Sequence, residues 1–285
     1  MRKFIALFFA VLSTGCVTTY TGGPDHPAPL ANGASFSVQN DVVFSPSGWP
    51  KELKADVYIP DGAGPFPAVL VAHGGGWITG RRAEMGHICK QLAGHGLVAV
   101  NIDYRLAPEF TFPSHLQDLQ LAMHWIHAHA GDYRINEHRI GAWGYSAGAE
   151  LVSLLGTLSP GDPNFAAGTR VQAVVSGGTP ADLRFAGDNS LVKQYIGYKI
   201  EDKPELYRQA SPLAFVSADD PPMFFYHGTF DWVIGEINAK RMKEELDRVG
   251  VPAELYLVHG AEHIGTFTSG YGVDEGVAFL RRKLR

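Results

Sequence analysis

The residues of this sequence that could do chemistry are a serine, an aspartate and a histidine. Ser146 stands between Gly144 and Gly148 in the segment GYSAG, Asp231 follows the apolar run PPMFFYHG, and His263 follows the apolar run LYLVHG. A serine hydroxyl is a weak nucleophile until a base takes its proton, and that base needs a carboxylate to orient it. These residue types predict a serine nucleophile, provided that the fold brings them together.

The predicted elements place Ser146 at a turn between a strand, RIGAWGY, and a helix, AGAELVSLLGTL. The flanking glycines leave room for a sharp turn that forces the serine into a strained backbone conformation and exposes its hydroxyl. Ala147 then presents its N–H at a helix N-terminus, where negative charge is stabilised. Because the chain contains 33 glycines, this pattern alone is weak evidence and needs concordant partners.

The acid can be selected by its position relative to a strand. Open α/β sheets bind ligands beyond the carboxyl ends of their strands. Asp231 follows the predicted strand PPMFFYHG, whereas Asp219 and Asp220 precede it. Asp231 is therefore the predicted acid, with Glu262 and Asp219 as fallback acids.

Two histidines follow the last predicted strand, PAELYLVHG. His259 lies at its end, and His263 lies further on, in a glycine-containing loop ahead of the final helix. A longer loop lets an imidazole reach back over the nucleophile, so we predict His263 as the base and keep His259 as the alternative. The order serine, aspartate, histidine is the one that α/β-hydrolase triads follow along the chain.

A run of glycines in AHGGGWITG supplies a further element. It follows the third predicted strand, at the same sheet edge as the serine. Glycines allow backbone N–H groups to approach a substrate carbonyl without obstruction, as an oxyanion hole requires. With Ala147 as one donor, Gly75 and Gly76 are the other predicted donors, and Gly74 is the alternative. Trp77 either lines the acyl pocket or packs behind the glycines.

Strands and helices alternate along most of the chain. Strand-like segments come first, and buried strands then alternate with helices to the end. This predicts an α/β fold with a central, mostly parallel sheet of about eight strands and helices on both faces. The catalytic domain is predicted over residues 38–285. Within it, residues 178–220 interrupt the alternation of strands and helices and are predicted to form a small lid-like excursion.

The overall composition favours a globular protein. The chain has 285 residues, of which 45% are hydrophobic and 19% charged, so it can bury a full core. Its net charge is -5, with no long run of one sign. Such a charge distribution does not indicate a basic surface for binding nucleic acid, and we expect no nucleic-acid partner.

The first residues, MRKFIALFFAVLSTGC, predict export. Basic residues come first, an apolar run follows over residues 4–12, and small residues lead to Cys16. This run is too short to span a bilayer, and the pattern is typical of a signal peptide. LSTGC resembles the lipobox of bacterial lipoproteins, whose cysteine is lipidated, although Ser13 stands where an aliphatic residue is usual.

The sequence therefore predicts that the protein is exported to the bacterial cell envelope and anchored to a membrane through a lipid on Cys16. The signal peptide is predicted over residues 1–16, and residues 17–37, rich in Gly, Pro, Ser and Thr, are predicted to form a flexible tether. An ordinary secretory signal cut near the same place is the alternative.

The cysteines and histidines predict neither a disulfide nor a metal site. Lipidation of Cys16 would leave Cys89 with no partner, and Cys89 is predicted to be buried in a helix. A cluster of histidines lies in or beside the next predicted helix, but no carboxylate at matching spacing completes a metal site. These histidines are His115, His124, His127 and His129.

A set of ordered motifs resembles the esterase branch of the α/β-hydrolase superfamily, near the hormone-sensitive-lipase-like and BD-FAE-type bacterial esterases. The motifs are HGGGW, NIDYRLAPE, GYSAG, HGTFD and GAEH, and the resemblance covers residues 40–285. It implies the α/β-hydrolase fold and a serine carboxylic ester hydrolase that works through an acyl-enzyme, without metal or organic cofactor. Tyr145 stands where the hormone-sensitive-lipase-like group usually has Asp, which favours the capless relatives, among them polysaccharide deacetylases and feruloyl esterases.

The resemblance implies a small ester or an acylated saccharide as substrate. A neighbouring group with a similar glycine motif hydrolyses an amide, so an arylformamidase-like (kynurenine formamidase) hydrolase is an alternative. A non-catalytic envelope binding protein on the same fold is a second alternative. The sequence makes no prediction of the oligomeric state.

Overall fold

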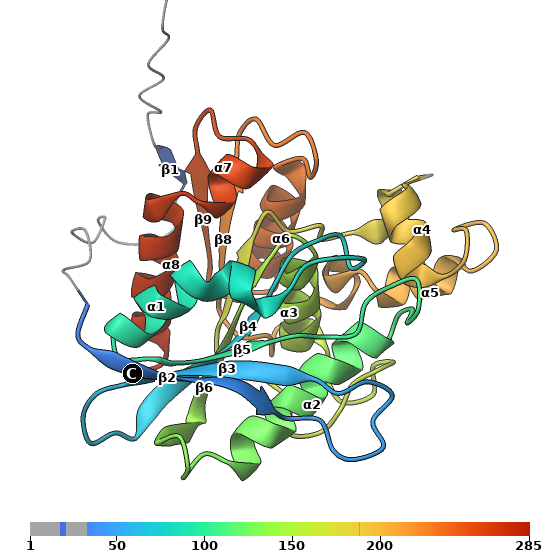
Figure 1. Cartoon of the computed structure of the whole chain (residues 1–285). Helices are drawn as coiled ribbons and strands as arrows, with labels where there is room; N and C mark the ends of the chain where they lie inside the picture. Colours follow the sequence, from blue (N-terminus) through green and yellow to red (C-terminus); the bar gives the residue numbers. More distant parts are fainter. Residues whose placement is uncertain (1–17, 21–32, 188) are drawn as a thin grey trace, which may run out of the picture.

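A central sheet of nine strands organises the computed structural model, which describes residues 18–20, 33–187 and 189–285 (Figure 1). The strand order is β1-β9-β8-β7-β6-β4-β5-β3-β2. Neighbours from β5 to β9 pair in parallel, while β1, β2 and β3 pair antiparallel at the two edges. The strands are β1 Thr18–Tyr20, β2 Phe36–Val43, β3 Lys54–Pro60, β4 Phe66–Ala72, β5 Val98–Ile102, β6 Ile135–Tyr145, β7 Val174–Gly177, β8 Met223–Gly228 and β9 Ala253–Val258.

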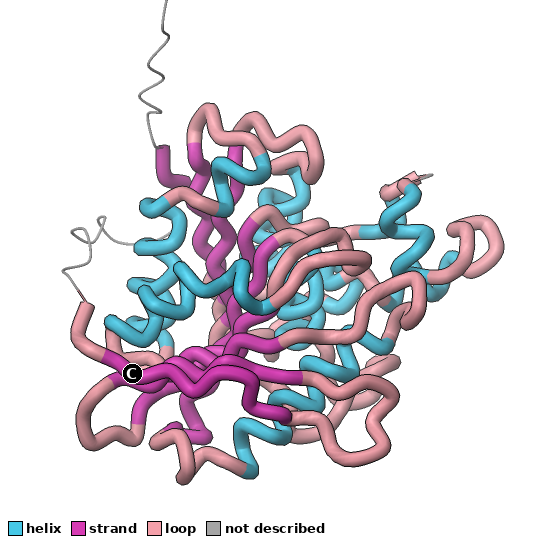
Figure 2. Tube along the Cα trace, viewed as in Figure 1, coloured by secondary structure: helices cyan, strands magenta, loops and turns pink. Residues whose placement is uncertain are grey.

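Helices cover both faces of this sheet (Figures 1 and 2). Helices α1 and α8 contribute to one apolar cluster, and α2, α3 and α6 contribute to the other. The helices are α1 Gly86–Gly94, α2 Ser114–Ala128, α3 Ala147–Thr157, α4 Ser190–Ile196, α5 Pro204–Gln209, α6 Ile237–Arg248, α7 His263–Phe267 and α8 Gly270–Lys283. The predicted α/β architecture, with a mostly parallel sheet between two helical layers, is confirmed.

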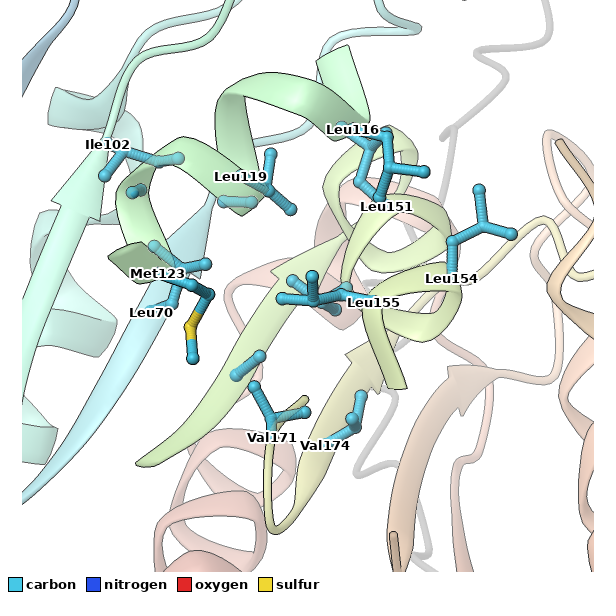
Figure 3. Packing of buried hydrophobic residues seen from close by; sticks show 14 of the residues in the cluster. Leu70, Ile102, Leu116, Leu119, Met123, Leu151, Leu154, Leu155, Val171 and Val174 are labelled. Atoms are coloured by element: carbon cyan, nitrogen blue, oxygen red, sulfur yellow. The ribbon is translucent and has the colours of Figure 1, made fainter. Parts of the chain in front are cut away.

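The packing between α2 and α3 fixes the helix that follows the candidate nucleophile. Leu119 of α2 and Leu151 and Leu155 of α3 belong to one buried cluster with Leu70 of β4 and Val174 of β7 (Figure 3). Burying such side chains stabilises the fold by about 1.5–3 kcal/mol each. Helix α3 is therefore held firmly against the centre of the sheet.

The N-terminal boundary differs from the prediction. Thr18–Tyr20, inside the predicted tether, forms β1 and pairs with the edge of β9, and β2 begins at Phe36 rather than at residue 38. Threonine and tyrosine favour strands, and an edge strand offers unpaired backbone groups, which explains the extra pairing. The predicted signal peptide with Cys16, and residues 21–32 of the predicted tether, lie outside the described residues.

Residues 178–220, called here the lid segment, contain short elements. They are α4, α5 and the 3₁₀ turns Leu183–Phe185 and Pro212–Phe215. Helices α4 and α5 project from one side of the sheet (Figure 1). Across the described residues, 18–20, 33–187 and 189–285, no helix has the length and apolar character needed to cross a membrane. Cys89, predicted to be buried, is fully buried in α1.

Candidate active site

Ser146 occupies a strained turn between β6 and α3. Its backbone φ is 53° and ψ is -120°, a conformation that residues other than glycine rarely adopt. The Ser146 N–H donates to the carbonyl of Gly177 in β7 at 2.8 Å, and its carbonyl accepts from Ala149 in α3 at 2.9 Å. These bonds hold the turn from both sides and present the hydroxyl to the carboxyl edge of the sheet.

The two flanking glycines let this turn pack closely. A Cβ added at Gly144 would lie 2.1 Å from the carbonyl oxygen of Gly148, and one added at Gly148 would lie 2.3 Å from that of Ala72 in β4. Such contacts are sterically impossible without a backbone shift. The segment GYSAG therefore has glycine where a side chain would push α3 away from the sheet.

His263 lies between Ser146 and Asp231. Its Nε2 is 3.0 Å from Ser146 Oγ, and its Nδ1 is 2.6 Å from Asp231 Oδ2. Because a carboxylate accepts hydrogen bonds, Nδ1 carries the proton in the neutral ring, and Nε2 is left to accept from the serine hydroxyl. The three predicted residues therefore form one hydrogen-bonded chain.

His263 is the first residue of α7, whereas the sequence predicts a loop there. Helix α7 forms because the side chain of Glu262 caps it, accepting from the N–H groups of Ile264 at 2.8 Å and Gly265 at 2.5 Å. Glu262 is thus engaged in the cap and not with His263. The other fallback acid, Asp219, precedes β8 and pairs with Arg170 at 2.6 Å. His259 lies between β9 and α7.

Asp231 is held ionised by its surroundings. Burial raises its pKa, but hydrogen bonds from His227 and His263 and from the N–H of Ile234 outweigh burial and lower the pKa well below its usual range. Oδ1 accepts from the N–H groups of Val233 and Ile234, at 3.0 and 2.9 Å. The turn after β8 therefore presents Oδ2 to the imidazole.

His227 is a second histidine on this carboxylate. Its Nε2 lies 2.7 Å from the carbonyl of Ile234 and 3.3 Å from Asp231 Oδ2. Because a carbonyl oxygen can only accept a hydrogen bond, His227 Nε2 carries a proton. This N–H is shared between the Ile234 carbonyl oxygen and Asp231 Oδ2. His227 ties the end of β8 to the turn that carries Asp231.

Tyr145 contacts His263 with both its hydroxyl group and its ring. Its hydroxyl donates to the backbone carbonyl of His263, and its ring lies 5.2 Å from the imidazole, measured between centroids. Tyr145 is buried and ends β6, directly before the serine. The residue that departs from the hormone-sensitive-lipase-like pattern is therefore a support for the histidine.

The glycine loop lies beside the serine hydroxyl. Gly75 and Gly76 have φ values of 107° and 58°, and Gly74 lies so close that a Cβ there would be 3.3 Å from Ser146 Cβ. Ala147 begins α3, so its N–H has no partner within the helix. These residues all line the same pocket as the serine, as an oxyanion hole requires.

A buried carboxyl group joins the glycine loop to α3. Glu150 is fully buried, and its Oε2 accepts from the indole N–H of Trp77 at 2.9 Å and from the hydroxyl of Tyr195 at 3.3 Å. The Trp77 and Tyr195 rings stack with centroids 4.4 Å apart and planes 4° from parallel. Trp77 is buried behind the glycines while also lining the pocket, so it combines both predicted roles.

Burial raises the pKa of Glu150 well above its usual range, and the two hydrogen bonds offset this incompletely. Burial therefore favours the neutral form of this carboxyl group, whose carbonyl oxygen still accepts hydrogen bonds. The contact joins three segments: α3 behind the serine, the glycine loop, and α4 of the lid segment through Tyr195.

The loop after β5 also makes contacts beneath the site. The Tyr104 hydroxyl donates to the carbonyl of His73 at 2.8 Å, and Arg105 pairs with the buried Asp118 at 2.9 Å. His115 is buried next to the carbonyl of Trp77, and burial lowers its pKa to about 3. Among residues 18–20, 33–187 and 189–285, no group of His, Cys, Asp and Glu side chains is arranged to hold a metal ion.

The pocket above Ser146 has a volume of about 640 Å³, within the usual range for small-molecule sites. Apolar side chains from the lid segment, from the loop after β8 and from helices α6 and α7 form most of its wall. Polar groups lie among them, at Asp182, Asn189, Asn238 and Arg241.

Sequence reasoning missed the supporting roles of Glu150, Tyr145, His227 and Tyr195. A lone acidic residue in the apolar helix AGAELVSLLG was the available signal for Glu150. The other three carry no pattern of their own, because their roles depend on which elements pack together.

Comparison with known proteins supports the same architecture. The family model described as BD-FAE matches residues 55–246. Esterase LipC of Mycobacterium tuberculosis is 33% identical over 216 residues, which cover 70% of this chain and 53% of LipC. The chain spans about half the length of the curated relatives that it matches first.

Solved structures show the fold. A truncated carbohydrate esterase from gut microbiota superposes with a TM-score of 0.77 at 22% identity, covering 90% of this chain and 99% of that one. A thermophilic esterase from Thermogutta terrifontis, Est2 with propionate bound, superposes with a TM-score of 0.71 at 22% identity, covering 88% and 94%. Both proteins place this chain among α/β-hydrolase folds.

The hydrogen-bonded chain predicts an activated serine. We expect a fluorophosphonate probe to label Ser146 of the wild type, as located by mass spectrometry of the labelled peptide. His263→Ala removes the group that accepts the serine proton and should slow labelling by at least about 100-fold. His259→Ala is the matched control and should label at the wild-type rate. Slow labelling of His259→Ala with normal labelling of His263→Ala would reverse the assignment.

The buried Glu150 predicts a pH-dependent effect on stability. Its raised pKa means that the folded state binds the proton more tightly than the unfolded state, so its contribution to stability falls as pH rises above the ordinary carboxyl pKa. The fall is up to about 1.4 kcal/mol per pH unit. In Glu150→Gln the glutamine side chain still accepts the hydrogen bond from Trp77 but cannot ionise. The free energy of unfolding of this variant, relative to that of wild type, should therefore increase between about pH 5 and pH 8.

Urea denaturation across this pH range measures the effect. Glu244→Gln, at an exposed position of α6, is the control for loss of a carboxylate, and the change with pH for Glu150→Gln should exceed the change for this control. A change with pH for Glu150→Gln no larger than that for the control would contradict the burial argument.

Proposed function

Because the chain belongs to the BD-FAE family of α/β-hydrolases, we propose that it is a serine carboxylic ester hydrolase. The observation that carries this proposal is the chain of hydrogen bonds from Ser146 through His263 to Asp231, next to a glycine loop and open to a small-molecule pocket. The names of its relatives, which include esterases and a carboxylic ester hydrolase, support the same reaction.

In the first half of the proposed reaction, Ser146 Oγ attacks the carbonyl carbon of the ester. His263 Nε2 takes the hydroxyl proton as the new C–O bond forms, and the carbonyl oxygen becomes an oxyanion. The N–H groups of Gly75, Gly76 and Ala147 hold that oxyanion. The bond to the leaving oxygen then breaks, His263 gives its proton to that oxygen, and an alcohol departs from the acyl-enzyme.

In the second half, water replaces the alcohol. His263 takes a proton from the water as its oxygen attacks the acyl carbon, and a second oxyanion forms in the same place. The bond to Ser146 breaks, the serine recovers its proton from His263, and the carboxylic acid leaves. Asp231 stays ionised throughout and stabilises the imidazolium. This chemistry uses the chain's own residues and calls for no metal or organic cofactor.

The proposed substrate is a small ester or an acylated saccharide. The pocket volume and its mixture of apolar walls and polar groups support a small acyl compound. Among the fold relatives, one is a carbohydrate esterase and another binds propionate, which supports short acyl groups and sugar alcohols.

We also propose that the protein is exported to the bacterial cell envelope and anchored to a membrane by a lipid on Cys16. The support is the basic start, the apolar run and the lipobox-like LSTGC of the sequence. The net charge of -5 supports the expectation that nucleic acid is not a partner.

A substrate panel tests the reaction. Purified wild type should hydrolyse short p-nitrophenyl esters, and assays on feruloyl esters, acetylated xylan and N-formyl-kynurenine rank its substrates. Ser146→Ala should lower kcat/KM by at least about 1,000-fold, because the nucleophile is lost, with an unchanged circular dichroism spectrum. Ser47→Ala, at an exposed position, is the control and should retain activity.

Other results of the substrate panel would favour one of the alternative functions. Hydrolysis of N-formyl-kynurenine well above every ester would favour the amidase. No turnover of any substrate, together with no fluorophosphonate labelling, would favour the binding protein. Near-wild-type activity of Ser146→Ala would remove the assigned nucleophile.

Gly75→Ala tests the glycine loop. A Cβ at Gly75 would lie 2.2 Å from the carbonyl oxygen of Thr79, so the loop must shift. One oxyanion donor contributes about 3 kcal/mol, and we expect kcat to fall by about 100-fold with a small change in KM. Gly250→Ala is the control. Like Gly75, Gly250 has a positive φ, here 83°, but a Cβ added to it would have no atom within 4 Å.

Both substitutions strain the backbone and should lower the melting temperature. Gly250→Ala should nevertheless keep the wild-type kcat. A Gly75→Ala protein with unchanged kcat would remove the glycine loop from the proposed reaction.

A further inference from the structure

Exposed apolar side chains surround the mouth of the pocket. Several of them line it, and two large aromatic residues stand on the loop between β8 and α6. Trp232 is 85% exposed and Phe230 is 67% exposed, which is unusual for such large apolar groups. Together the apolar rim consists of Phe185, Phe230, Trp232, Val233, Ile237 and Ile264.

Hydrogen bonds join the loop after β8, which carries Phe230, Trp232 and Val233, to the loop that leads from β9 into α7. The N–H of Phe230 donates to the carbonyl of Ala261 at 3.0 Å, and the N–H of Gly260 donates to Thr229 Oγ1 at 2.9 Å. The loops follow β8 and β9, so both lie at the carboxyl edge of the sheet, and the second leads directly into α7, which carries His263 and Ile264. The apolar rim is therefore one surface at the catalytic edge.

The first described strand ends at this same edge. β1 runs antiparallel to β9, with Thr18 opposite Leu257 and Tyr20 opposite Leu255. Because β9 ends at Val258, the N-terminal end of β1 lies at the catalytic edge, at the same end of the sheet as α7 (Figure 1). Cys16 precedes Thr18 by one intervening residue, and two residues of chain reach at most about 7 Å.

We propose that the apolar rim docks on a lipid bilayer, so that the mouth of the pocket faces the membrane surface. The N-terminal end of β1 lies at the catalytic edge, where the exposed aromatic residues are, and the proposed lipid on Cys16 would be attached two residues before that end in the sequence. Tryptophan and phenylalanine are side chains that insert into the boundary between headgroups and acyl chains. This inference rests on the proposed export and anchoring and adds the orientation of the active site.

Charges of both signs lie beside the rim. Glu236, which precedes Ile237, pairs with Lys240 at 2.6 Å, and the Arg241 guanidinium lies 5.7 Å from the centroid of the Phe185 ring. Because carboxylates and cations are both present, docking does not depend on anionic lipid. The surface is therefore suited to zwitterionic phospholipid, and the esters that reach the serine from it are short-acyl esters of amphiphilic alcohols that partition into the bilayer.

Quenching of tryptophan fluorescence tests the docking directly. Full-length wild type is mixed with phosphatidylcholine vesicles whose acyl chains carry bromine, which quenches tryptophans that insert among them. Trp232 is one of five tryptophans, so we expect roughly one fifth of the emission to be quenched. Trp232→Gln should lose this quenching. Val43→Gln is the control, because Val43 is an exposed apolar residue on β2, at the opposite end of the sheet, and it should quench like wild type.

Activity supplies an independent readout. Trp232→Gln should hydrolyse water-soluble p-nitrophenyl acetate like wild type, but an acetyl ester of a long-chain alcohol dispersed in the vesicles at least about threefold more slowly. Wild type without quenching, or equal quenching in Trp232→Gln, overturns the inference whether or not esters are hydrolysed. A protein that hydrolyses no ester fails the proposed function, and the quenching experiment still decides the orientation.

Discussion

The active site depends on the backbone conformation of one residue. A serine at φ 53° costs about 1–3 kcal/mol, and it persists because β7 and α3 bind it on both sides. The turn can exist only if α3 approaches the sheet closely, which Gly144 and Gly148 permit. The buried leucines between α2 and α3 supply the packing that maintains this approach. The apolar core therefore stabilises a strained local geometry that exposes a hydroxyl.

The other parts of the site are attached to the same centre by hydrogen bonds. Tyr145, directly before the serine, binds the backbone of His263, so the strand that ends at the nucleophile also places the base. Glu150, one helical turn after the serine, binds Trp77 and through it the glycine loop. The candidate nucleophile, base and oxyanion donors are thus all in contact with a single strand–turn–helix unit.

The sequence predicted the fold and the reacting side chains for a common physical reason. Buried parallel strands produce continuous apolar runs, and reactive groups must follow such runs at the carboxyl edge, so Ser146, Asp231 and His263 could be found by position. The supporting residues could not. Trp77 and Glu150 lie 73 positions apart, and nothing local shows that they meet. β1 was missed because a short edge strand has no hydrophobic period to distinguish it from a tether.

Specificity must come from a different part of the molecule than catalysis. The family match ends at residue 246, before the last strand and the helix that carries His263, and the solved structures share the fold at low identity. The walls of the pocket come largely from the lid segment, from the loop after β8 and from helices α6 and α7. The lid segment and the loop after β8 are connecting segments at the carboxyl edge of the sheet, and connecting segments vary more readily than the core. In the proposed reaction, the core fixes how the serine reacts, while the exposed residues around the mouth fix which substrates reach it.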